Sequence, residues 1–360
     1  MRILTINSTL RNLAVAAFRG GSDKPILKQQ VGGSGDDRTL ASEQAEADVF
    51  LPVSRALEEA GMLPLDVIAV RGLHGGERFK RPVFASESVL AELATLAPQA
   101  PLHVPRLIEI VEAAGRAFPL TPVVLVFETA FFVPLPERER RYGVDPELTD
   151  SRSLRRYGYH GIFHEGACLH AVRKLESREP CLLSICLEPR PELAACRGRR
   201  PVMVTGGSTP VEGLPGETSC GDLDPSVVLK LADDGRLGPE GTNHLLTCKS
   251  GLRGLTGRNV SLAELLQSSD EDLQLAKDVF LHHLLRACGA GIAALGGLDA
   301  IVYSGRYADS ASVLHDWLNG RLRATLQRDT ASLLHSHTLA QHLRDIAYVM
   351  VRESGVAAAV

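Results

Sequence analysis

One stretch of the sequence gathers several side chains that can do chemistry. Between Leu154 and Gly166 the chain reads LRRYGYHGIFHEG, with two arginines, two tyrosines and two histidines beside glycines. Histidine can transfer a proton or donate a hydrogen bond near neutral pH, and glycine lets the backbone approach a ligand closely. The stretch indicates an active-site wall with His160 facing a ligand. The alternative interpretation is a polar turn that leads into a helix.

Further candidates follow apolar runs that read as buried strands. Arg71 comes directly after one such run and begins the turn RGLHGG, and Glu128 follows another. Ligands bind at the carboxyl ends of strands in open α/β sheets, and a guanidinium can hold a carboxylate or phosphoryl group through two parallel hydrogen bonds. Arg71 therefore favours anion binding, against the alternative of a surface arginine. Asn7 follows the first apolar run and reads equally well as an ordinary turn residue.

The composition excludes several classes of protein. The chain has 360 residues, of which 44% are hydrophobic and 23% charged, and its net charge of −4 gives no basis for a nucleic-acid or anionic-membrane partner. No apolar run approaches the ~20 residues that span a bilayer, and the N-terminus does not read as a signal peptide. Seven scattered cysteines without a CxxC pair argue against a zinc site and for reduced thiols. We therefore expect a cytoplasmic protein.

Apolar runs alternate with helical patterns along the chain, which is typical of an α/β protein. The segment 20–38 is expected to be an exposed loop, and the charged segment 134–153, with three prolines, a domain linker. The second expected strand returns along the first as a hairpin. Strands are expected at 2–6, 13–18, 65–70, 123–127, 181–187 and 299–303, and helices at 45–60, 106–117, 273–294 and 339–351.

Six motifs together resemble the acetate kinase (acetokinase) family in order and spacing. The resemblance implies an α/β fold of two domains, the duplicated ribonuclease H-like fold of the acetate and sugar kinase, Hsp70 and actin superfamily. It implies a substrate-side domain at 1–150, to which the helix 339–351 returns, and a nucleotide-side domain at 151–338. The motifs are VRGLHGGERF (70–79), APLHVP (100–105), VFETAFFVPLP (126–136), RRYGYHGIFH (155–164), TPVEGLPGETSCGDLDP (209–225) and KSGLRGLTG (249–257).

The same resemblance implies phosphoryl transfer between ATP and a short-chain carboxylate such as acetate, with acyl phosphate on the other side of the reaction. It also implies Mg²⁺ and a cytoplasmic homodimer. Because two anions meet in this reaction, charge neutralisation and in-line positioning would supply most of the catalysis. The family positions imply catalytic roles for Arg71, His103, Glu128 and His160, and contacts with nucleotide and Mg²⁺ for Asn7 and Asp309.

Two departures from the family pattern concern the reacting groups. Glu128 stands where the family has an aspartate, so its carboxylate reaches one methylene further, and a displacement of ~1 Å can cost ~100-fold in rate. Ser219 stands where the family has its second catalytic arginine. Losing one of two cations that face a developing negative charge weakens stabilisation of the transition state. Arg253 and Arg258 are nearby candidates for a replacement.

Two further departures concern the nucleotide loops. The glycine-rich phosphate loop is replaced by CLEPRPELAA (186–195), whose prolines lack an N–H and whose Glu188 adds negative charge. The second loop, GRYADSASV (305–313), has lost its later glycines and keeps Asp309. We expect a family member with impaired or lost ATP-dependent activity. The alternatives are a non-catalytic binding or regulatory protein, and a kinase that uses another donor such as pyrophosphate.

Overall fold

The chain forms two compact units in the computed structural model, which describes residues 1–8, 12–31, 49–151 and 153–355. The first unit comprises Met1–Ala130 and His337–Val360, and the second comprises Phe131–Ser336. Helix α14 (Leu339–Ser354), close to the end of the chain, thus belongs to the same unit as β1 (Arg2–Ser8). The domain boundary expected at residue 150 stays a prediction.

The first unit is built on a six-stranded sheet with the order β3-β2-β1-β4-β6-β5. Strands β1, β4 and β6 are parallel neighbours, whereas β2 and β3 continue the sheet from β1 in antiparallel fashion. The buried runs of β4 and β6 are almost wholly apolar, as expected for parallel strands covered on both faces. The strands other than β1 are β2 (Leu13–Arg19), β3 (Leu27–Val31), β4 (Val67–Gly72), β5 (Val83–Phe84) and β6 (Val123–Phe127).

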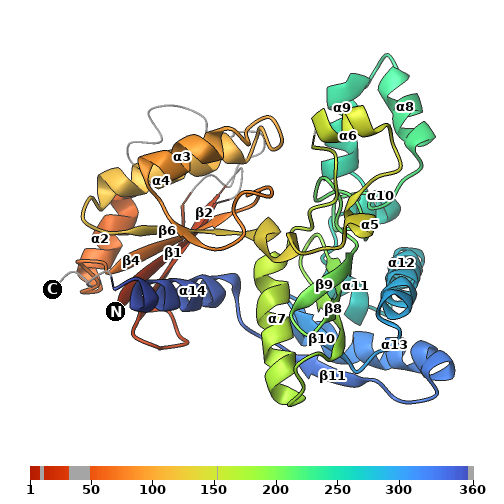
Figure 1. The fold of residues 1–360 in the computed structure, drawn as a ribbon. Helices are drawn as coiled ribbons and strands as arrows, with labels where there is room; N and C mark the ends of the chain where they lie inside the picture. The colour runs from red at the N-terminus through yellow and green to blue at the C-terminus, as the bar shows by residue number, and fades with distance from the viewer. Residues whose placement is uncertain (9–11, 32–48, 152, 356–360) are drawn as a thin grey trace. The chain divides into compact units, whose positions relative to one another are not determined.

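Helices cover both faces of this sheet. In Figure 1, α3 and α4 lie on one side of the strands and α14 on the other. Helix α14 packs against β1, β4 and β6, so the chain returns to its starting sheet. Among the described residues, the other elements of this unit are α2 (Leu51–Glu59), α3 (Glu87–Ala94) and α4 (Val104–Ala117). The 3-10 helix η1 (Glu128–Phe132) contains the chain boundary between the two units.

The second unit is built on a five-stranded sheet with the order β11-β10-β7-β8-β9. Helix α7 (Gly161–Lys174) packs against β7 and β10, and the long helix α12 (Glu271–Leu295) packs against β7, β8 and β9. The strands are β7 (Cys181–Cys186), β8 (Glu192–Arg197), β9 (Arg200–Val204), β10 (Ala300–Ser304) and β11 (Ala331–Leu334). The other helices are α5 (Glu137–Arg140), α6 (Pro146–Ser151), α8 (Pro225–Asp233), α9 (Gly238–Cys248), α10 (Gly251–Thr256), α11 (Leu262–Gln267), η2 (Ala308–Ser310) and α13 (Ala311–Leu326).

The two sheets repeat one topology. In the first sheet, β1, β2 and β3 form an antiparallel meander, and the other edge of β1 pairs in parallel with β4, which pairs in parallel with β6. In the second sheet, β7, β8 and β9 form the meander, and the other edge of β7 pairs in parallel with β10, which pairs in parallel with β11. The end of β4 in the first unit therefore corresponds to the end of β10 in the second. The loop between β7 and β8 corresponds to the loop between β1 and β2.

Some expectations for individual elements were wrong. The segment expected to be an exposed loop contains β3, an edge strand whose run LKQQV has too few apolar residues to be seen as a strand. Asn7 was expected in a loop but lies within β1. The helix expected from residue 45 begins at Leu51 in the described part, and residues 45–48 lie outside it. The segment 134–153, interpreted as a linker, forms α5 and α6 within the second unit.

Candidate active site

Three of the predicted site residues meet at one edge of the first sheet. The guanidinium Nε of Arg71 lies 2.5 Å from Oε1 of Glu128, and its Nη1 lies 3.4 Å from Oδ1 of Asn7. These residues stand at or near the carboxyl ends of β4, β6 and β1, which are adjacent parallel strands. The Glu128 side chain is fully buried and that of Arg71 is 14% exposed. Arg71 is thus a mostly buried cation held by an internal carboxylate.

The turn after Arg71 packs tightly on the end of β6. A Cβ atom on Gly75 would lie 2.7 Å from the ring of Phe127, and the Gly75 N–H donates to Oγ1 of Thr129 at 3.0 Å. Only glycine permits this approach. His74, in the same turn, lies 3.0 Å from Oε1 of Gln99, and burial lowers its pKa despite that hydrogen bond. The His74 ring is therefore buried and in contact with Gln99.

His103 occupies the N-cap position of α4, in the same unit as Arg71. The next two residues, Val104 and Pro105, form the first turn of that helix, and proline is well suited to this position because its fixed φ matches the helix. His103 is half-buried. Its catalytic role, implied by the family position, remains a prediction.

His160 lies in the second unit, at the N-cap position of α7. Its ring Nε2 lies 2.8 Å from the carbonyl oxygen of Arg190, so this nitrogen carries the proton and donates it. Its backbone N–H donates to Oε1 of Glu192 at 2.9 Å. Both the ring and the backbone of His160 are therefore fixed by the segment that follows β7.

Glu192 is a site residue that sequence reasoning missed. Its buried carboxylate accepts the backbone N–H groups of Tyr159 and His160, at the N-terminal end of α7, and lies 3.3 Å from Nε2 of His164. Nδ1 of His164 in turn lies 2.8 Å from the Ser184 hydroxyl. Burial alone would raise the pKa of Glu192, but the contact with His164 and the nearby charge of His160 lower it. Glu192 is therefore a buried anion at a helix N-terminus.

The loops that follow β7 and β10 are joined to each other. The Glu188 carboxylate accepts the backbone N–H of Arg306 at 2.8 Å and its guanidinium Nε–H at 3.1 Å. The carbonyl of Leu187 accepts the N–H of Tyr307 at 3.0 Å. In a phosphate loop, backbone N–H groups of this kind point at the ligand. Here a carboxylate of the same chain occupies the N–H of Arg306.

Asp309 and Ser219 are the other two positions in the second unit that the family pattern singled out. Asp309 lies in η2 and its side chain is exposed. Ser219 is buried, and the nearby arginines do not turn toward it: Arg258 pairs with Asp270 at 2.6 Å, and exposed Arg253 donates to the carbonyl of Cys248 at 3.4 Å. Neither of the two expected replacements for the missing arginine therefore stands at Ser219.

The described residues do not offer a preformed Mg²⁺ site at the two predicted positions. Mg²⁺ prefers octahedral oxygen ligands, usually carboxylates with waters and phosphates. The Oδ1 atom of Asn7 already faces the Arg71 guanidinium, which would repel a divalent cation, and Asp309 brings a single exposed carboxylate in the other unit. The residues of this chain thus do not match the metal contacts that the family position implies.

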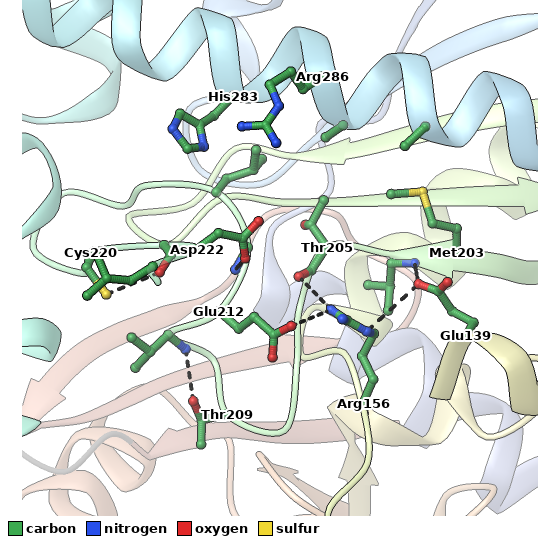
Figure 2. Close-up of a pocket in the computed structure, with 18 of the residues that line it drawn as sticks. Glu139, Arg156, Met203, Thr205, Thr209, Glu212, Cys220, Asp222, His283 and Arg286 are labelled. Atoms are coloured by element: carbon green, nitrogen blue, oxygen red, sulfur yellow. Dashed lines mark hydrogen bonds and ion pairs between the residues drawn. The ribbon is translucent and has the colours of Figure 1, made fainter. Parts of the chain in front are cut away.

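A cavity of about 860 Å³ lies in the second unit, between α12, the end of β9 and the segment 205–223 (Figure 2). Nη1 of Arg156 lies 2.8 Å from Oε1 of Glu212, so charges of opposite sign neutralise each other in its wall. None of the predicted site residues lines this cavity. Its other charged or titratable lining residues are Glu139, Cys220, Asp222, His283 and Arg286.

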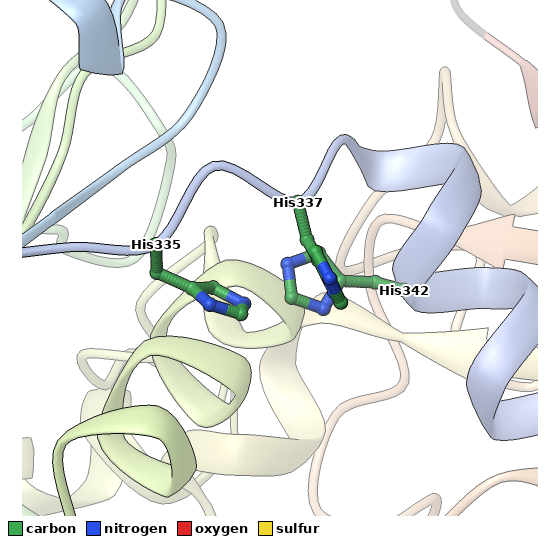
Figure 3. A group of neighbouring side chains, drawn as sticks. All are labelled: His335, His337 and His342. Carbon is green, nitrogen blue, oxygen red and sulfur yellow. The ribbon is translucent and has the colours of Figure 1, made fainter. Parts of the chain in front are cut away.

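Two histidines pack at the N-terminal end of α14 in the first unit. The rings of His337 and His342 lie edge to face, with centroids 5.6 Å apart (Figure 3), and Thr338 caps the helix between them. His335 belongs to the second unit, where its ring lies 5.2 Å from that of His170.

All seven cysteines carry free thiols, four of them buried, in agreement with the absence of a disulfide pattern in the sequence. Of the helices in the described ranges, none combines the length and apolar character that crossing a membrane requires.

Comparisons with known proteins agree on one family. The acetokinase family model matches residues 26–355. The acetate kinase of Corynebacterium jeikeium is 37% identical over 257 residues, which cover 70% of this chain and 64% of that protein, less than two thirds of its length. The acetate kinase of Clavibacter sepedonicus is 36% identical over 298 residues, or 79% of this chain and 74% of that protein.

Solved structures show the same fold. A propionate kinase from Francisella tularensis aligns with a TM-score of 0.85 and 21% identity over 97% of this chain and 99% of its own. The acetate kinase of Porphyromonas gingivalis aligns with a TM-score of 0.83, also at 21% identity and with the same two coverages. The expected fold class, a two-domain α/β fold of the acetate kinase type, is confirmed.

Proposed function

Because the chain belongs to the acetokinase family, we propose that it is an acetate-kinase-like protein whose ATP-dependent phosphoryl transfer is impaired or lost. The family reaction transfers a phosphoryl group between ATP and a short-chain carboxylate. The observation that carries the proposal is the position of Glu188 and Glu192, whose carboxylates accept backbone N–H groups of Arg306, Tyr159 and His160.

Carboxylates in these positions oppose nucleotide phosphates in two ways. They use donors that would otherwise bind phosphate oxygens, and they place negative charge where a polyphosphate would approach. Two unit charges 4 Å apart repel by ~1 kcal/mol in water and by ~4 kcal/mol at the effective dielectric constant near a protein surface. The backbone also disfavours phosphate binding, because Pro189 and Pro191 offer no N–H in the same loop.

The substrate side supports retained binding of a small anion. Arg71 presents a guanidinium at the carboxyl edge of three parallel strands, and the glycine turn beside it gives a ligand access to the backbone. An incoming carboxylate or acyl phosphate must share this guanidinium with Glu128, which is already bound to it. Arg71 would therefore hold and orient the anion while Glu128 fixes the guanidinium.

The same observations also fit a non-catalytic member that binds a carboxylate or acyl phosphate in a regulatory role. The departures from the family pattern are concentrated in the loops that would contact the nucleotide. From the family we propose a cytoplasmic homodimer that has no nucleic-acid or membrane partner.

Turnover measurements test the proposal. The purified chain is incubated with acetyl phosphate and Mg-ADP, and ATP formation is followed beside the Clavibacter sepedonicus acetate kinase as a positive control. We expect a rate at least ~100-fold below that of the control, given the displaced carboxylate and the missing arginine. A rate equal to the control would refute the proposal. Formation of acetyl phosphate from acetate and pyrophosphate would instead identify a changed phosphoryl donor.

A further inference from the structure

Arg190 is a half-buried cation in the loop between β7 and β8. Among the described residues, no carboxylate lies within ion-pair distance of its guanidinium. Burial lowers the pKa of Arg190, and the Cys248 thiol is the titratable group that acts on it. Buried cations in proteins are normally paired, because an unpaired buried charge is costly. A guanidinium left without a carboxylate partner is available to an anion from outside the chain.

The backbone around Arg190 is held on both sides. The carbonyl of Pro189 accepts the Glu217 N–H at 2.7 Å, and the carbonyl of Arg190 accepts the ring Nε2–H of His160 at 2.8 Å. These contacts join the loop to the segment that contains Ser219 and to the N-terminal end of α7. The Arg190 side chain therefore extends from a fixed backbone position that is directly linked to His160.

Arg190 also adjoins Ser219, the position where the family pattern has an arginine. A Cβ atom on Gly216 would lie 2.4 Å from Oγ of Ser219 and 3.3 Å from Cα of Arg190. The two residues therefore flank the same point in the structure. A side chain that begins at Arg190 can reach the surroundings of Ser219, whereas Arg253 and Arg258 make other contacts.

We propose that Arg190 replaces the cation lost at Ser219 and binds a small phosphate-bearing anion such as inorganic phosphate or an acyl phosphate. The choice of ligand class rests on the proposed function, whereas the cation and its position do not. A single guanidinium can hold one phosphate group bidentately. The carboxylates of Glu188 and Glu192 nearby leave no comparable cradle for a polyphosphate.

Titration of the full-length chain with inorganic phosphate, followed by ³¹P line broadening, tests the inference. We expect saturable binding by the unchanged chain, weakened about tenfold or more in Arg190→Gln, because charge-assisted contacts to phosphate are lost. Arg253→Gln is the matched control: it removes an exposed arginine of the same region and should leave binding unchanged. Arg190→Lys should bind with intermediate strength, since it keeps the charge without the bidentate geometry.

Arg190→Gln removes no main-chain contact, and a thermal melt equal to that of the unchanged chain establishes that it folds. Equal phosphate binding by the unchanged chain and Arg190→Gln would overturn the inference, as would the absence of saturable binding by the unchanged chain. Tight binding of Mg-ATP by the unchanged chain would contradict the proposed function but not the role of Arg190. The role of Arg190 and the proposed function are therefore contradicted by different measurements.

Discussion

Glu188 binds Arg306 twice, through the backbone N–H at 2.8 Å and through the guanidinium Nε–H at 3.1 Å. The two residues come from the loops after β7 and β10, which are adjacent parallel strands. The carboxylate thereby links the two loops in which the family pattern has its glycine-rich phosphate contacts.

Removing the two internal carboxylates should create anion binding. In the double variant Glu188→Gly and Glu192→Ser, the N–H groups of Arg306 and His160 become available, so we expect measurable binding of pyrophosphate by calorimetry, carried out at a temperature where a thermal melt shows that this destabilised variant is still folded. The matched control is Arg306→Gln, which breaks the ion pair but keeps the Glu188 carboxylate in place. Pyrophosphate binding that is equally weak in the double variant and the unchanged chain would show that these carboxylates do not limit access.

Glu192 should contribute strongly to stability. Replacing it with alanine leaves His164 and two N–H groups buried without their anion, and breaking a buried pair in this way costs about 3–5 kcal/mol. The free energy of unfolding is measured by urea denaturation at pH 7. Glu165→Ala, which breaks an exposed pair with Arg199, should cost no more than about 1 kcal/mol. Similar losses in the two variants would contradict the role given to Glu192.

The contribution of Glu192 should depend on pH. Its pKa is lower in the folded chain than its ordinary value of 4.5, so the folded state stabilises the carboxylate. This stabilisation is present above about pH 4.5 and is lost as the pH falls through the lower folded pKa. Urea denaturation between pH 7 and pH 3 should therefore show a steeper loss of stability for the unchanged chain than for Glu192→Gln. Parallel curves would contradict the prediction.

Arg71 and Glu128 should be energetically coupled. A double-mutant cycle with Arg71→Ala, Glu128→Ala and both together should give a coupling free energy above ~1 kcal/mol, because the pair is mostly buried and within hydrogen-bond distance. Thermal or urea unfolding supplies the four stabilities. The exposed pair of Arg258 and Asp270 provides a control cycle, where the coupling should be smaller. Additive effects at Arg71 and Glu128 would contradict the geometry.

The cluster of Asn7, Arg71 and Glu128 was predictable because apolar runs reveal buried parallel strands, and the ends of adjacent strands meet at one edge. The same signal identified β6 and β10, whose runs are buried and apolar. It missed β3, because a polar edge strand is stabilised by hydrogen bonds to β2 and buries little apolar surface.

Glu192 could not be found in this way. In the sequence it is one polar residue at the start of an apolar strand, PELAAC, and nothing local indicates its partners. Those partners are the N-terminal end of α7 and His164, which only the packing of α7 against the sheet brings to it. Arg190 is visible in the sequence as a positive charge in the segment 186–195, but its position beside Ser219 follows from folding alone.

A calorimetric titration of the unchanged chain with Mg-ATP tests the proposed loss of ATP-dependent activity most directly. We expect no saturable heat up to millimolar nucleotide, because carboxylates of the chain accept the backbone N–H groups of Tyr159, His160 and Arg306. A dissociation constant in the micromolar range would contradict it and would show that the loops after β7 and β10 accept a nucleotide.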